Sequence, residues 1–105
     1  METESYIHEG QVFEWDRGKQ LANIRKHGIT FKIAARAFFD PLAEKFIDDA
    51  HSHNENRFIL IGMDEVDRVL TVCHCMRGDD ENIIRIISAR KATIYEQELY
   101  EGGFQ

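Results

Sequence analysis

The chain has 105 residues, of which 43% are hydrophobic and 30% are charged, a composition typical of a soluble globular protein with one hydrophobic core. Its net charge of −6 argues against non-specific binding to nucleic acid, which depends on Lys and Arg contacts to phosphates. No apolar run approaches the roughly 20 residues that a membrane helix requires, and the polar N-terminus lacks a secretory signal, so we expect a cytoplasmic protein.

The first half of the sequence predicts one short strand and then two helices. We expect residues 1–11 to form a flexible N-terminal tail and residues 12–105 to form a single domain. Alternation of apolar and polar side chains over residues 12–15 predicts a strand. Asp16 suits the N-cap of a helix over residues 17–27.

A second helix is expected to begin after Thr30 and to stop before Pro41. Apolar residues at i, i+3, i+4 and i+7 from Phe31 give it a stripe that faces a core. The residue before a proline avoids the helical region, so the helix ends there. The link between the two helices is short, which predicts a compact helical hairpin.

After Pro41 the hydrophobic period changes from 3.6 to 2, which predicts strands. Short polar turns between them favour antiparallel neighbours, and Thr93 with Glu96 forms a capping-box pattern for a last helix. The expected fold class is α+β, with a mostly antiparallel sheet, an N-terminal helical hairpin and a C-terminal helix. The expected elements are strands over residues 42–49, 57–63, 68–77 and 82–90 and a helix over residues 94–101.

A register set by the tight turns brings polar and cationic side chains to one face of the sheet. In this register Arg57 lies opposite His74, and Arg90 lies on the same face about 13 Å along the strand. A slip of one residue would exchange the two faces. The structural alternatives are a bridge from Arg57 to Glu55 or Asp49, a buried His74 bonded to a backbone carbonyl, a solvated Arg85, and a pair of Arg90 with Glu96 or Glu98.

Two clusters of ligand-type residues are considered as metal sites. A strand directs His74 away from Cys73 and Cys75, which we expect to be reduced thiols. His51 and His53 lie with acidic residues in a polar loop, and no second ligand motif occurs elsewhere. We therefore expect neither a metal nor a cofactor.

Five segments between about Phe13 and Tyr100 form a specific set. They are FEWD at 13–16, NIRKHG at 23–28, FFDP at 38–41, RFILIG at 57–62 and IISARKAT at 86–93. Together they resemble the BrnT family of toxins from bacterial type II toxin–antitoxin modules. The resemblance implies a RelE/ParE-like fold and a metal-independent endoribonuclease that halts translation.

The resemblance also suggests which residues form the site. The positions carried over from it are Lys26, His27, Arg57, Arg77, Arg90, Glu96 and Tyr100. For cleavage by the 2′-hydroxyl of the RNA, we assign Arg57 and Arg90 to the developing phosphorane and His74 to general acid–base catalysis. The substrate-binding residues assigned are Lys26, His27, Arg77 and Arg85.

The implied partners are an RNA substrate and a BrnA-like antitoxin with a ribbon-helix-helix domain, through which the complex binds operator DNA. A toxin–antitoxin heterotetramer is the assembly that the family suggests. Two other functions remain open, namely a non-catalytic co-repressor subunit and a ParE-like toxin with a protein target.

Overall fold

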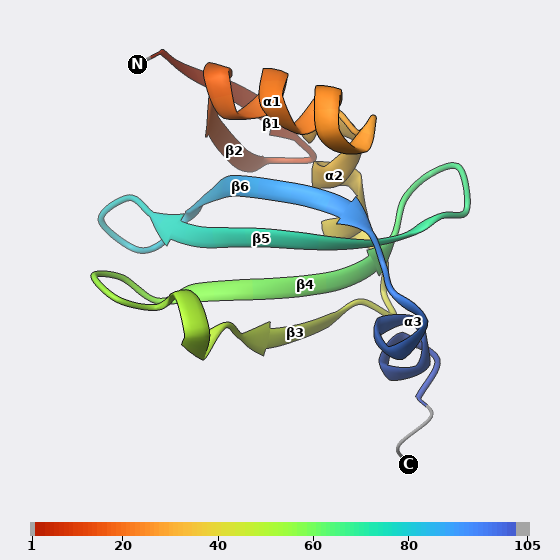
Figure 1. Ribbon diagram of the computed structural model, residues 1–105. Coiled ribbons are helices and arrows are strands. Elements are labelled where there is room, and N and C mark those ends of the chain that lie inside the picture. Colours follow the sequence, from red (N-terminus) through yellow and green to blue (C-terminus); the bar gives the residue numbers. More distant parts are fainter. Residues whose placement is uncertain (1, 103–105) are drawn as a thin grey trace.

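The computed structural model describes residues 2–102, which form one mixed sheet with helices on both of its faces (Figure 1). The order of the strands in the sheet is β1-β2-β6-β5-β4-β3. None of the helices in this range is long and apolar enough to span a membrane. The elements are β1 (Thr3–His8), β2 (Gln11–Asp16), α1 (Arg17–His27), α2 (Phe31–Arg36), η1 (Ala37–Phe39), β3 (Glu44–Ile47), η2 (Asp49–His51), β4 (Arg57–Met63), β5 (Val69–Arg77), β6 (Ile83–Lys91) and α3 (Ile94–Tyr100).

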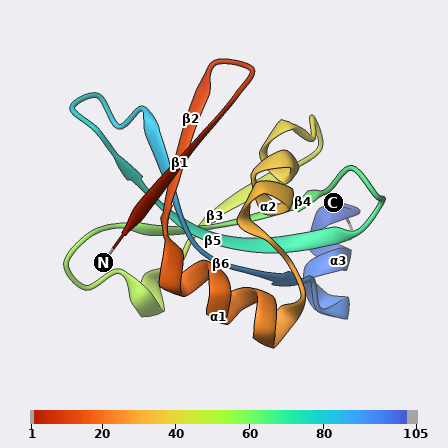
Figure 2. The ribbon, with the colours of Figure 1, turned by 90° about the horizontal axis from the view of Figure 1, so that it is seen from above.

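The chain begins with a strand hairpin, so the expected RelE/ParE-like arrangement with an N-terminal helical hairpin is wrong. β1 pairs with β2 in antiparallel fashion, and both precede α1 and α2. β2 also pairs with β6 in parallel fashion, which makes the sheet mixed. Seen from above, the β1–β2 hairpin runs steeply across the direction of β4 and β5 and projects beyond them (Figure 2).

Residues 3–8 form β1, where a flexible tail was expected over residues 1–11. Alternate side chains of this strand are half-buried, and the Tyr6 ring packs 6.3 Å from the ring of Trp15. Glu9 and Gly10 both have positive φ angles, of 49° and 83°. Two successive residues of this kind make the turn that joins twisted antiparallel strands.

α1 occupies the expected residues and is fixed by its caps and by Asn23. The Asp16 carboxylate accepts a hydrogen bond from the Lys19 N–H, and the helix ends at Gly28 with a φ of 70°. The buried Asn23 amide donates to the carbonyl of Ala89 on β6 and accepts from the Ala89 N–H, at 2.9 and 3.0 Å. This side chain therefore pairs with β6 as a neighbouring strand would, beyond the residues that β2 covers.

The hydrophobic core lies between the sheet and the segment that contains α2 and η1. Trp15 and Phe31 are fully buried there, and their rings meet edge to face at 5.8 Å. Gly62 on β4 allows η1 to approach the sheet, because a Cβ at this position would lie 2.7 Å from the Ala37 carbonyl oxygen.

Candidate functional site

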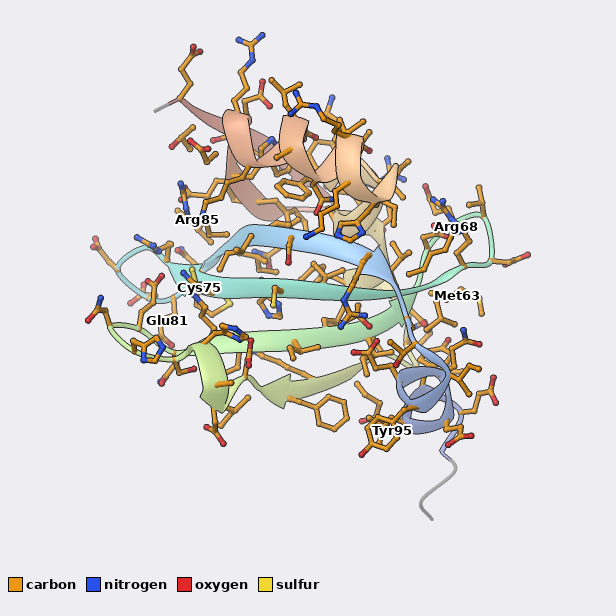
Figure 3. All side chains as sticks on the ribbon, viewed as in Figure 1. Met63, Arg68, Cys75, Glu81, Arg85 and Tyr95 are labelled. Atoms are coloured by element: carbon orange, nitrogen blue, oxygen red, sulfur yellow. The ribbon has the colours of Figure 1, made fainter. Side chains whose placement is uncertain are left out.

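The sheet surface opposite α2 and η1 carries four arginines, and we call it the arginine face. Residues paired directly across antiparallel strands project from the same face. Figure 3 shows Arg85 and Cys75 near the same end of β6 and β5. The three rows on this face are Arg57–Cys75–Arg85, Ile59–Cys73–Ser88 and Ile61–Thr71–Arg90 across β4, β5 and β6, and Arg77 follows Cys75 on β5.

The register between β4 and β5 differs from the expected one by one residue. Arg57 pairs with Cys75, and His74 pairs with Phe58. Arg57 and His74 therefore lie on opposite faces of the sheet. An irregularity at Cys73/His74 shifts the pairing of β5 with β6. This shift brings Arg90 to the same face as Arg57.

His74 is fully buried on the core side of the sheet. Its ring packs 4.8 Å from that of Phe38 and 5.7 Å from that of Phe58, and Nδ1 lies 3.3 Å from the Val72 carbonyl oxygen. Burial lowers the pKa of His74 to about 4, so the imidazole is neutral near pH 7. Because the ring has no access to a substrate on the arginine face, its assignment to acid–base catalysis is not supported.

Arg90 forms a bidentate ion pair with Glu96 of α3. This pair was one of the structural alternatives to a catalytic role for Arg90. Its Nη1 and Nη2 donate to the two carboxylate oxygens at 2.7 and 2.9 Å. Glu96 also accepts from the Thr93 N–H and the Thr71 hydroxyl, and the predicted capping box is present. The bonds from Arg90, foremost, hold the pKa of Glu96 near 2. Arg90 thus anchors α3 on the arginine face.

Tyr100 is likewise engaged in packing α3. Its hydroxyl donates to Asp40 at 2.6 Å, and this bond, with burial, raises the pKa of Tyr100 to about 12. Asp40 in turn accepts from the Met63 N–H at the end of β4. The phenol therefore stays protonated near pH 7 and acts as a fixed donor.

Arg57 differs from the other arginines of this face. Arg85 Nη1 lies 2.6 Å from Glu14, and Arg77 Nη2 lies 3.1 Å from Glu55. Within residues 2–102, the Arg57 guanidinium makes no ion pair with a carboxylate. Its charge is therefore the most available on the face for a bound anion.

Lys26 and His27 occupy the last turn of α1. With Lys19 they line a shallow hollow of about 290 Å³, whose other wall includes Ile87 and Ser88 of β6. Ser88 also belongs to the middle row of the arginine face. The structure therefore places these two residues beside the arginine face, although on a different element.

The loop between β3 and β4 contains a pair that the sequence analysis considered only as part of a possible metal cluster. His51 Nδ1 lies 2.9 Å from Asp48 Oδ2, and the Cys73 thiol donates to the same oxygen at 3.7 Å. Asp48 is 8% exposed. The described residues contain no group of three or more His, Cys, Asp or Glu placed to hold a metal ion. The sequence signal for this contact was the spacing of Asp48 and His51, because one helical turn brings residues i and i+3 together.

Comparisons with known proteins identify relatives of the chain. Residues 15–96 match a family model described as the ribonuclease toxin BrnT of a type II toxin–antitoxin system. The 1.1 Å crystal structure of the ribonuclease toxin BrnT from Brucella abortus superposes with a TM-score of 0.56 at 25% identity, covering 75% of this chain and 92% of that one. No curated protein sequence matches the chain.

Proposed function

The chain belongs to the BrnT family of ribonuclease toxins of type II toxin–antitoxin systems, and from this membership we propose that it is a metal-independent endoribonuclease that cuts RNA and inhibits translation in the cytoplasm. RNA needs no metal for its own cleavage, because the 2′-hydroxyl can attack the adjacent phosphorus. The protein must then bind the phosphate, stabilise the charge that develops on it and move two protons.

The observation that carries this proposal is the row of Arg57, Cys75 and Arg85 on the arginine face. Adjacent strands lie about 4.8 Å apart, so the two arginines begin about 10 Å apart on β4 and β6. Within residues 2–102 the Arg57 guanidinium makes no carboxylate ion pair, and Glu14 accepts from Nη1 of Arg85. A guanidinium has five N–H donors, so both side chains retain donors for phosphate oxygens.

We assign Arg57 to the phosphate that reacts and Arg85 to a neighbouring phosphate. Lys26 and His27 extend this cationic path beyond Ser88 at the hollow beside α1. Arg77 and Arg90 are held by Glu55 and Glu96. Their proposed role is to shape the face and add to its positive potential, with fewer donors left for direct contact.

A type II toxin is neutralised by a protein antitoxin, so the family implies such a partner for this chain. We propose that the partner is a BrnA-like protein with a ribbon-helix-helix domain. The toxin–antitoxin complex, as a heterotetramer, would then bind operator DNA through the antitoxin. The family membership supports this assignment, and co-purification with the product of the neighbouring gene tests it.

The catalytic proposal is tested with the toxin freed from its antitoxin. Wild type is expected to cut RNA in excess EDTA and to leave 2′,3′-cyclic phosphate ends. Arg57→Ala is expected to lower the cleavage rate about 100-fold or more, as removal of one transition-state donor does elsewhere. Arg17→Ala is the matched control, because Arg17 lies on α1 in a solvent-exposed pair with Glu2. Cleavage that requires added metal, or equal rates for both variants, would refute the proposal.

A further inference from the structure

The loop from Asp48 to Arg57 is tied together at its base. The Asp48 N–H donates to the Arg57 carbonyl oxygen at 2.8 Å. The Ser52 hydroxyl donates to the Asp48 carbonyl and accepts from the Arg57 N–H, at 2.7 and 2.9 Å. Within this frame His51 ends the short 3-10 turn η2. The imidazole is therefore held on a fixed backbone.

The imidazole of His51 contacts Asp48 through Nδ1, and its second nitrogen, Nε2, points away from Asp48. Nδ1 lies 2.9 Å from Oδ2 of the nearly buried Asp48, whereas the His51 side chain is 67% exposed. A carboxylate accepts but cannot donate when ionised. The neutral imidazole in this bond therefore carries its proton on Nδ1 and presents a lone pair on Nε2. An orienting carboxylate of this kind also stabilises the imidazolium that forms when Nε2 takes up a proton.

His51 lies at the same hollow as Arg57, the arginine without a carboxylate partner among residues 2–102. His51 and Arg57 line the same hollow of about 190 Å³, next to the row of Arg57, Cys75 and Arg85. On the basis of the ribonuclease function proposed above, we propose that His51 is the general base for cleavage and that Asp48 is its positioning residue. An RNA strand whose phosphate binds Arg57 would present its ribose to this hollow.

In the proposed step, Nε2 of His51 removes the proton of the 2′-hydroxyl. The 2′ oxygen forms a bond to phosphorus, and the bond from phosphorus to the 5′ oxygen breaks. The 5′ oxygen leaves with the bonding electron pair and takes a proton from solvent, and His51 returns its proton to solvent. The products are a 2′,3′-cyclic phosphate and a free 5′-hydroxyl.

Several charged or titratable groups surround this base. Asp48 contacts it directly, and the Cys73 thiol of β5 contacts the same carboxylate. Burial raises the pKa of Cys73, so that thiol is neutral near pH 7. Arg57 on β4 lines the hollow, as do three residues of the loop. Those three residues are His53, Asn54 and Glu55, of which Glu55 is bound to Arg77 of β5.

The test compares His51→Ala with His8→Ala, which removes an imidazole that packs 4.8 Å from the Phe39 ring and does not line this hollow. His51→Ala is expected to lower kcat about 100-fold or more, with KM unchanged and with unchanged binding of an RNA that carries a 2′-deoxyribose at the cut site. Its remaining activity should lose the acidic limb of the pH profile, and added imidazole should restore part of the rate. His8→Ala should cleave as wild type does.

Asp48→Asn provides the second arm, because an amide can keep the contact but cannot stabilise an imidazolium. It is expected to lower kcat with normal RNA binding and a normal melting temperature. Wild-type kcat in His51→Ala, or a loss confined to RNA binding, would overturn the assignment of the base and leave the ribonuclease function intact. Absence of RNA cleavage by wild type would overturn both.

Discussion

Replacement of His74 by leucine should stabilise the protein and remove much of its sensitivity to acid. Among the residues that the structure describes, Nε2 of this fully buried ring finds no hydrogen-bond partner. A buried polar atom without a partner costs about 1–3 kcal/mol. Leucine is close to histidine in volume and needs no partner among Phe38, Phe58 and Val72. We therefore expect His74→Leu to raise the free energy of unfolding by about 1 kcal/mol at pH 7.

The advantage should grow as the pH falls. The pKa of His74 is about 4 in the folded protein, against an ordinary value of 6.5. The unfolded chain therefore binds the proton more tightly, and wild type loses stability as the pH falls from 6.5 towards 4. Linkage gives a loss from this residue of about 2 kcal/mol at pH 5 and about 3 kcal/mol at pH 4. At pH 5 the variant should thus exceed wild type by about 3 kcal/mol.

Urea unfolding at pH 7 and pH 5, followed by the fluorescence of Trp15, measures these differences. His53→Ala serves as the control for loss of an imidazole outside the core. This variant keeps His74 and should therefore still lose stability between pH 7 and pH 5. If wild type and His74→Leu lost equal stability between pH 7 and pH 5, the buried neutral state of His74 would be refuted. The variant should also cleave RNA, and inactivity of the folded variant would restore His74 as a catalytic candidate.

Three further predictions concern side chains that fix the frame of the site. Asn23→Leu removes three buried hydrogen bonds to backbone atoms and should lower the free energy of unfolding by about 3 kcal/mol, measured by urea unfolding against the exposed control Leu21→Asn. Gly62→Ala places a Cβ 2.7 Å from the Ala37 carbonyl oxygen and should cost about 1–3 kcal/mol; an unchanged melting temperature would contradict the close approach of η1. Thr93→Ala removes the N-cap of α3 and should cost about 1 kcal/mol, whereas Thr93→Ser should restore the wild-type value.

Local signals in the sequence predicted the helices. They could not predict which strands pair when those strands lie far apart in the sequence. Asp16 and Thr30 act as caps in the structure as the sequence indicates. β1 was missed because its turn at Glu9 and Gly10 lacks the common Asn-Gly or Asp-Gly signal. The parallel contact of β2 with β6 joins segments about 70 residues apart. No local pattern specifies such a partner.

The predicted register between β4 and β5 was wrong because of the turn that joins these two strands. Asp64 accepts from the N–H groups of Val66 and Arg68, and Asp67 has a φ of 64°. This turn pairs Met63 with Val69, one residue further than expected. Because side chains alternate along a strand, that single step moved His74 into the core.

At the site, the sequence supplied candidate residues and left their partners undecided. The pair of Arg90 with Glu96 was among the structural alternatives, since both residues flank a predicted helix start. The contact between Asp48 and His51 depends on a 3-10 turn within a polar loop. A loop sequence without periodicity does not indicate which of its side chains meet, so only the structure distinguished His51 from His53.

The parallel contact between β2 and β6 has a consequence for the folding of the protein during its synthesis on the ribosome. β2 precedes its partner β6 by about 70 residues, so Phe13 stays without its neighbour Ile84 until β6 has been synthesised. Contacts of such long sequence separation form late and slowly. The rows of the arginine face also need β6, and an interrupted translation product that ends before Ile83 should therefore be harmless to the cell that makes it.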